Sequence, residues 1–121
     1  MKVGAAFFLI ALMTTAPGRQ LKELKDEGQV IYSRECASCH GADGTGDGAG
    51  PSLAGNTALA NRTLVIKRIL EGEVDKGMDP FGKVLNDREV AAVATFVRNA
   101  WENTHGVVLE ADVKTVREQS K

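Results

Sequence analysis

Apolar residues recur along much of the chain at spacings of three and four, the pattern of helices that bury one face. Three segments carry this pattern, over residues 21–39, 63–71 and 87–102, and a shorter one spans 110–118. Their apolar positions include Leu21, Leu24, Val30 and Ile31, then Val65, Ile66, Ile69 and Leu70, then Val90, Val93, Phe96, Val97 and Ala100. No segment alternates like a strand, so the sequence predicts an all-α fold with three main helices.

Polar residues mark where the second and third helices begin. Asn61 or Thr63 is placed to cap the second helix. Asn86 or Asp87 is placed to cap the third, and Glu89 completes a capping box if Asn86 is the cap. These residues predict helix starts within a few positions.

Two loops separate the predicted helices. In residues 41–50, five of ten positions are glycine, which excludes regular structure. A second loop, over 72–82, carries Met78 and Pro80. The main helices are therefore joined by segments that can present side chains to a bound group.

The first 16 residues have the pattern of a secretory signal peptide. Lys2 is followed by an uncharged apolar run over 3–13 and by small residues up to Ala16. The run is too short to span a membrane, which takes about 20 apolar residues. We therefore expect export to the periplasm and a single mature domain over 17–121, with an uncertain cleavage site.

Charge and composition narrow the classes of function. Loss of residues 1–16 would remove one base and no acid, so the net charge would move from −1 to −2. A nucleic-acid-binding protein would be strongly basic, so that class is excluded. Aromatic residues are only 5% of the chain, so a domain of this size benefits from an apolar prosthetic group within its core.

The most informative motif is Cys36-Ala-Ser-Cys39-His40. The spacing C-x-x-C-H is the signal for covalent attachment of haem. On a helix, positions i, i+3 and i+4 share one face. The two thiols can then bond to the two vinyl groups of one haem c while the imidazole of His40 reaches the iron.

Other uses of this motif fit the chain poorly. A thioredoxin-like site would need a βαβ context, which the pattern lacks. A zinc site would need four ligands, and Cys36, Cys39 and His40 with the distant His105 are a poor set. Asp43 begins an apparent calcium loop, but its twelfth position is alanine where a bidentate glutamate is required.

The second axial ligand follows by elimination. Outside the predicted signal peptide Met78 is the only methionine, and His105 is the only other histidine. Met78 lies in a loop flanked by glycine and stiffened by proline, whereas His105 is expected on the surface. An iron-bound histidine normally donates its other ring N–H to an acceptor, for which the carbonyl of Pro51 is a candidate. A haem propionate would need a basic partner, for which the candidates are Arg62, Lys67 and Arg68, with Arg68 favoured. For each of them, an exposed position in solvent explains the residue equally well.

Taken together and in order, these motifs resemble the class I c-type cytochromes. The resemblance rests on Gly28 and Tyr32 in the first helix, the C-x-x-C-H motif, Gly50-Pro51-Ser52-Leu53, Met78-Asp-Pro-Phe81, and Val93 with Phe96 in the last main helix. It implies that the first and last main helices cross through Gly28, Tyr32, Val93 and Phe96. It also implies that Leu53 touches the haem. A monohaem cytochrome with His40 and Met78 as axial ligands transfers electrons and is not an enzyme.

The segment from Thr95 to Trp101, with the one from Asp112 to Arg117, looks like a narrower group. These are the small cytochrome subunits or domains of periplasmic dehydrogenases. The resemblance implies a dehydrogenase as electron donor and an oxidase or another cytochrome as acceptor, with no stable membrane span. Two alternatives stay open: a haem enzyme or gas sensor in which Met78 is labile, and a subunit tied permanently to one dehydrogenase rather than a diffusing shuttle.

Overall fold

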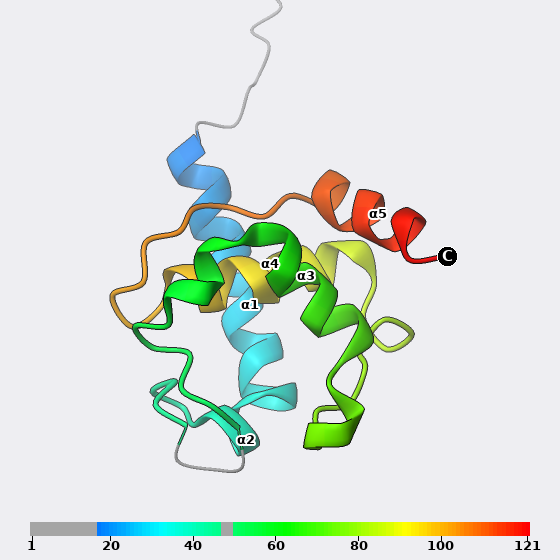
Figure 1. Cartoon of the computed structure of the whole chain (residues 1–121). Helices are drawn as coiled ribbons and strands as arrows, with labels where there is room; N and C mark the ends of the chain where they lie inside the picture. The colour runs from blue at the N-terminus through cyan, green and yellow to red at the C-terminus, as the bar shows by residue number, and fades with distance from the viewer. Residues whose placement is uncertain (1–16, 47–49) are drawn as a thin grey trace, which may run out of the picture.

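The computed structural model describes residues 17–46 and 50–121. Over these two ranges the chain forms α-helices, 3-10 helices and one isolated bridge, with no strand (Figure 1). The α-helices are α1 (Pro17–Glu35), α2 (Ala37–His40), α3 (Arg62–Glu71), α4 (Asp87–Asn99) and α5 (Glu110–Gln119), and the 3-10 helices are η1 (Thr57–Ala60) and η2 (Val74–Lys76). The all-α prediction is confirmed. The predicted signal peptide lies outside the described residues.

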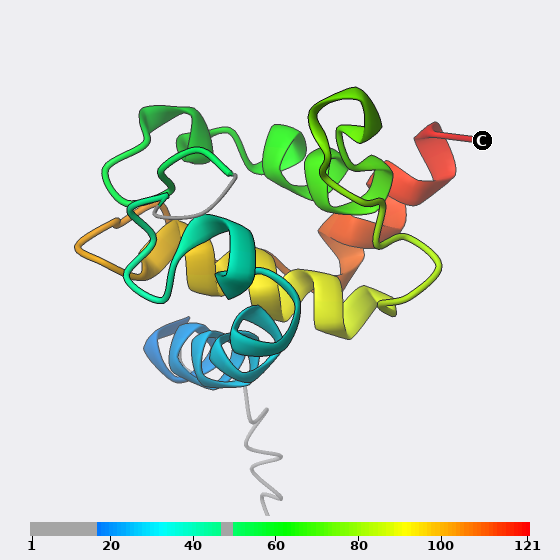
Figure 2. The same ribbon diagram turned by 90° about the horizontal axis from the view of Figure 1, so that it is seen from below.

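Helix α4 is the centre of the fold. Its residues from Val90 to Arg98 are all buried, and α1, α3 and α5 each pack against it. Figure 1 shows α4 in yellow crossing α1 in blue and cyan, and Figure 2 shows the same crossing with α1 viewed nearly end-on. A helix covered on nearly every side is apolar nearly all round, as this segment is.

The crossing of α1 and α4 depends on the absence of a side chain at Gly28. A β-carbon there would lie 2.7 Å from Cβ of Phe96 and would collide with the carbonyl oxygen of Ala92. One turn further along α1, the ring of Tyr32 lies 5.2 Å from that of Phe96 and 5.1 Å from that of Trp101, centroid to centroid. The helix crossing expected from the resemblance is thus present, with Trp101 as a third ring.

Three helix ends differ from the sequence prediction, the first being the start of α1, which lies at Pro17 rather than at residue 21. A single helix was expected over 21–39, but α1 ends at Glu35 and α2 is a separate turn. The hydroxyl of Tyr32 donates a 2.6 Å hydrogen bond to the carbonyl of Gly41, which ties the end of α2 back to α1. The third main helix ends at Asn99 rather than 102, because Trp101 and the residue after it adopt positive φ angles that a right-handed helix cannot contain.

The predicted caps of α3 and α4 are confirmed. The side chain of Asn61 accepts from the backbone N–H of Leu64 at 3.0 Å. Asn86 accepts from the N–H of Glu89 at 2.9 Å, and the Glu89 carboxylate accepts from the N–H of Asn86 at 3.0 Å, which forms the complete capping box. Local side-chain chemistry therefore sets where both helices begin.

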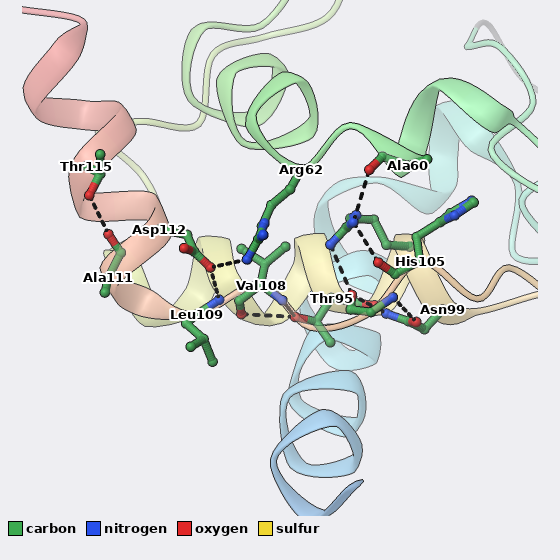
Figure 3. Close-up of polar contacts among 12 residues, drawn as sticks. Ala60, Arg62, Thr95, Asn99, His105, Val108, Leu109, Ala111, Asp112 and Thr115 are labelled. Atoms are coloured by element: carbon green, nitrogen blue, oxygen red, sulfur yellow. Dashed lines mark hydrogen bonds and ion pairs between the residues drawn. The ribbon is translucent and has the colours of Figure 1, made fainter. Parts of the chain in front are cut away.

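Helix α5 buries Val113 and Val116 in the core, and polar contacts also attach it and the segment before it to the rest of the fold (Figure 3). The hydroxyl of Thr95 both donates to and accepts from the backbone of Val108. Arg62, at the start of α3, donates to the carboxylate of Asp112 at 3.2 Å. In the part of the chain that the structure describes, no helix is long and apolar enough to cross a membrane.

Candidate haem site

His40 ends α2 and is oriented by the loop that follows. Its Nδ1 lies 2.8 Å from the carbonyl oxygen of Pro51. Because a carbonyl only accepts, Nδ1 donates in this contact, and in a neutral imidazole Nε2 then keeps its lone pair. This is the arrangement in which a histidine binds a metal through Nε2 and is held by its second nitrogen.

Gly50 allows this contact by giving the imidazole room. A β-carbon at Gly50 would lie 2.7 Å from Cε1 and 2.8 Å from Nδ1 of His40. The N–H of Gly50 donates to the carbonyl of Cys39 at 2.9 Å. Any larger residue would push the ring away from Pro51, so Gly50 and Pro51 act together to orient it.

The two cysteines lie on the same short turn as His40. The N–H groups of Cys39 and His40 both donate to the carbonyl of Cys36, at 3.2 and 3.1 Å. Cys36 is half-buried and Cys39 is exposed, and neither is in a disulfide. Burial, aided by the charge of Glu35, raises the pKa of the Cys36 thiol to about 11. The Cys36 thiol therefore stays protonated at neutral pH, and both free sulfur atoms start from one turn of helix.

Met78 lies on a different loop. We call residues 72–82, between α3 and the approach to α4, the Met78 loop. Met78 is half-buried and, among the described residues, stands outside the hydrophobic core. An isolated antiparallel bridge joins it to Glu73 through backbone bonds of 2.9 and 3.1 Å. Figures 1 and 2 place α2 and this loop at the same end of the molecule but apart from each other.

Other residues singled out in the sequence have different surroundings. Leu53 is half-buried and packs against the core. Arg68 is exposed on α3 and forms an ion pair with Glu73, so it lies next to the base of the Met78 loop. His105 is partly buried rather than fully on the surface, and its N–H donates to the carbonyl of Arg98 at 3.0 Å. Within the described ranges no cluster of histidine, cysteine or carboxylate side chains is placed to hold a bare metal ion.

Sequence reasoning missed two side chains that hold the loop around the site. The indole N–H of Trp101 donates to the carbonyl of Ala42 at 3.2 Å. Asn103 is buried, donates to the carbonyl of Leu53 and accepts from the N–H of Gly55. Both lie some fifty residues beyond their partners along the chain, and no local pattern signals such contacts.

These features define the class of protein, a c-type cytochrome. Residues 23–97 match the family described as "Cytochrome C oxidase, cbb3-type, subunit III", and the chain belongs to this family of c-type cytochrome domains. Membership implies haem c binding and electron transfer, and it confirms the predicted class of protein.

Three curated relatives are cytochrome subunits of dehydrogenases. The chain is 35% identical over 111 residues to the fructose dehydrogenase cytochrome subunit of Gluconobacter japonicus, covering 78% of this chain and 23% of the relative. It is 34% identical over 104 residues to the cytochrome c subunit of the quinone alcohol dehydrogenase of Gluconacetobacter polyoxogenes, covering 75% and 22%. It is 33% identical over 104 residues to the gluconate 2-dehydrogenase cytochrome c subunit of Pantoea cypripedii, covering 74% and 24%. The chain thus matches less than a quarter of each relative's length. These relatives are electron-transfer subunits, in line with the prediction of a carrier rather than an enzyme.

Proposed function

We propose that this domain is a monohaem cytochrome c that carries single electrons from a dehydrogenase to a respiratory acceptor. Haem c would be bonded to Cys36 and Cys39, and its iron would be held by His40 and Met78. When bound, this group supplies an iron that accepts and releases one electron. The single observation that carries the proposal is the 2.8 Å contact between Nδ1 of His40 and the carbonyl of Pro51.

The residues around the site fit the group. The His40 ring is fixed with Nε2 free, and the two sulfur atoms are on the same turn of helix. Met78 offers a neutral thioether from a separate loop, and a thioether raises the reduction potential relative to a second imidazole. Leu53 gives an apolar contact at the edge of the core. We propose that Arg68 binds a haem propionate. The propionate would then replace Glu73 as the ion-pair partner of Arg68.

Electrons would enter and leave at the edge near α2. Ala37 and Ser38 have small side chains, and Ser38 is exposed, so a partner can approach closely. Val74, within the Met78 loop, and Val84, just after it, are also exposed, at 67% and 62%. Small or singly exposed apolar side chains of this kind suit a transient redox encounter.

The donor that we propose is a dehydrogenase, because the relatives are cytochrome subunits of such enzymes. The acceptor would be an oxidase or another cytochrome. The signal-peptide pattern over 1–16 favours the periplasm. Purification from native membranes and periplasm tests the partner: a dehydrogenase that elutes with the chain supports a fixed subunit, and elution alone supports a shuttle.

Optical and mass spectra of the matured protein test the site. We expect a mass increased by one haem, a low-spin spectrum and the sulfur-to-iron charge-transfer band of methionine ligation. High-spin iron that binds CO readily at neutral pH would instead support the haem enzyme or gas sensor with a labile Met78. A mass without haem would reject both functions.

A further inference from the structure

We propose that Arg117, on the C-terminal helix α5, is a positioning residue that keeps the Met78 loop in place and so holds Met78 at the iron. This inference rests on the proposed axial ligation by Met78. Arg117 lies beyond residue 97, where the family match ends, so its role is not implied by the family.

The Met78 loop is closed at its base by α3. The N–H groups of Phe81 and Gly82 donate to the carbonyls of Ile69 and Leu70, at 2.9 and 3.1 Å. These bonds satisfy the backbone N–H groups of Phe81 and Gly82, where the loop ends. The carbonyl of Phe81 accepts from the N–H groups of Val84 and Leu85. The carbonyl of Gly82 takes its donor from a side chain elsewhere in the chain.

Arg117 supplies that donor. Its guanidinium donates to the carbonyl of Gly82, to the carbonyl of Leu85 at 2.5 Å and to the carboxylate of Asp87 at 2.6 Å. The three acceptors follow one another along the chain from the Met78 loop to the first residue of α4. One side chain therefore holds the whole exit of the loop against α5.

Gly82 is thus held on both sides, by Leu70 through its N–H and by Arg117 through its carbonyl. The Arg117 side chain is 27% exposed, so these bonds are partly shielded from water. A thioether is a neutral ligand. How well it competes with water or imidazole for the iron depends on how firmly its loop is held. A loop whose exit is loosened would present Met78 less often.

Arg62 provides a matched control. It also ties α5 to the body of the protein, through the carboxylate of Asp112 at 3.2 Å. It lies at the start of α3 and outside the Met78 loop. Arg62→Met and Arg117→Met therefore both weaken the attachment of α5, but only the second removes a direct hold on the loop.

The experiment is an imidazole titration of the ferric holoprotein at neutral pH, followed through the sulfur-to-iron band. We expect Arg117→Met to bind imidazole about tenfold more tightly than the unchanged protein, the factor that one charge-assisted hydrogen bond represents. Arg62→Met should match the unchanged protein. Arg117→Lys should behave like Arg117→Met, because an ammonium cannot span three acceptors in a row, and it carries the test if Arg117→Met fails to fold.

The outcomes separate this inference from the proposed function. Absence of the band in the unchanged protein would reject methionine ligation, and the role of Arg117 with it. Presence of the band together with unaltered imidazole affinity in Arg117→Met would reject the role of Arg117 alone. An equal gain in imidazole affinity in Arg62→Met would also overturn the role of Arg117. So would an imidazole affinity in Arg117→Lys equal to that of the unchanged protein. Either result would show that a guanidinium bonded to three acceptors is not needed to hold the loop.

Discussion

Gly28 of α1 lies directly against the backbone of Ala92 in α4. A β-carbon at Gly28 would overlap the Ala92 carbonyl and come within 2.7 Å of Cβ of Phe96. The two helix backbones therefore approach more closely here than any side chain allows. The distance between α1 and α4 is set at this one position, and α2 with His40 follows directly from the end of α1.

Gly28→Ala tests this contact. The β-methyl has to push the two helices apart, so we expect a loss of more than about 2 kcal/mol in the free energy of unfolding. Urea denaturation of the holoprotein measures it. Gly18→Ala is the control, because nothing lies within 4 Å of the β-carbon it adds in the same helix. That variant should be unchanged or gain up to about 1 kcal/mol from better helix propensity. Equal stability of the two variants would contradict the contact.

Met78→Ala tests the sixth ligand. The sulfur-to-iron band should disappear, the iron should become high-spin and bind CO, and the reduction potential should fall because the thioether is lost. Val74→Ala, four residues earlier and 67% exposed, should leave the spectrum unaltered. A normal spectrum for Met78→Ala would show that another residue binds the iron.

Arg98 is a buried cation whose contacts are all to backbone oxygen. Its side chain is 4% exposed and donates to the carbonyls of Leu59, Ala60, His105 and Gly106. The guanidinium thus joins η1 to the turn after α4, and Figure 3 shows Ala60 and His105 on either side of this network. Burial lowers the pKa of Arg98.

Arg98→Met should therefore be strongly destabilising. Each buried carbonyl left without a donor costs about 1–3 kcal/mol, so we expect a loss of about 3 kcal/mol or more in the free energy of unfolding. Thermal unfolding of the holoprotein measures this loss. Arg62→Met, which removes a half-exposed guanidinium from the same region, should cost less than about 1 kcal/mol. A loss for Arg98→Met that is no larger than for Arg62→Met would contradict the role of the network.

The ion pair between Glu27 of α1 and Arg88 of α4 predicts an acid dependence of stability. Arg88 donates two hydrogen bonds of 2.9 Å to the Glu27 carboxylate and holds its pKa below the usual 4.5. A carboxyl group with a lowered pKa in the folded protein contributes stability above pH 4.5, and that contribution is lost as the pH falls through the folded value.

Comparison with Glu27→Gln isolates this contribution. At pH 7 the unchanged protein should be more stable than Glu27→Gln by less than about 1 kcal/mol, because the pair is exposed and screened. As the pH falls below 4.5 and through the folded pKa of Glu27, the difference should vanish. A constant difference across this range, measured by urea denaturation, would show that the Glu27 charge does not stabilise the fold.

The parts of this structure that the sequence predicts depend on neighbours along the chain. Asn61 and Asn86 cap helices through residues only three positions away, so a short pattern suffices to find them. The placement of Pro51 beside His40 follows from the need of an iron-bound histidine for an acceptor. The crossing at Gly28 was found through the resemblance, because no local pattern states which helix a glycine faces.

The parts that sequence analysis missed depend on partners far along the chain. The break between α1 and α2 accompanies a hydrogen bond from Tyr32 to a carbonyl nine residues away. The early end of α4 comes with the positive φ of Trp101, whose ring packs on Tyr32. Arg117 reaches acceptors 30 to 35 residues earlier. Such contacts follow from the assembled core and leave no periodic signal.

The first and last helices, α1 and α5, both pack on the same central helix. Both ends of the described unit are thus anchored to its own middle. An electron-carrying unit built in this way can be transplanted between larger polypeptides without redesign of its interior. Such a self-contained interior is consistent with the match of this chain to less than a quarter of the length of several dehydrogenase cytochrome subunits.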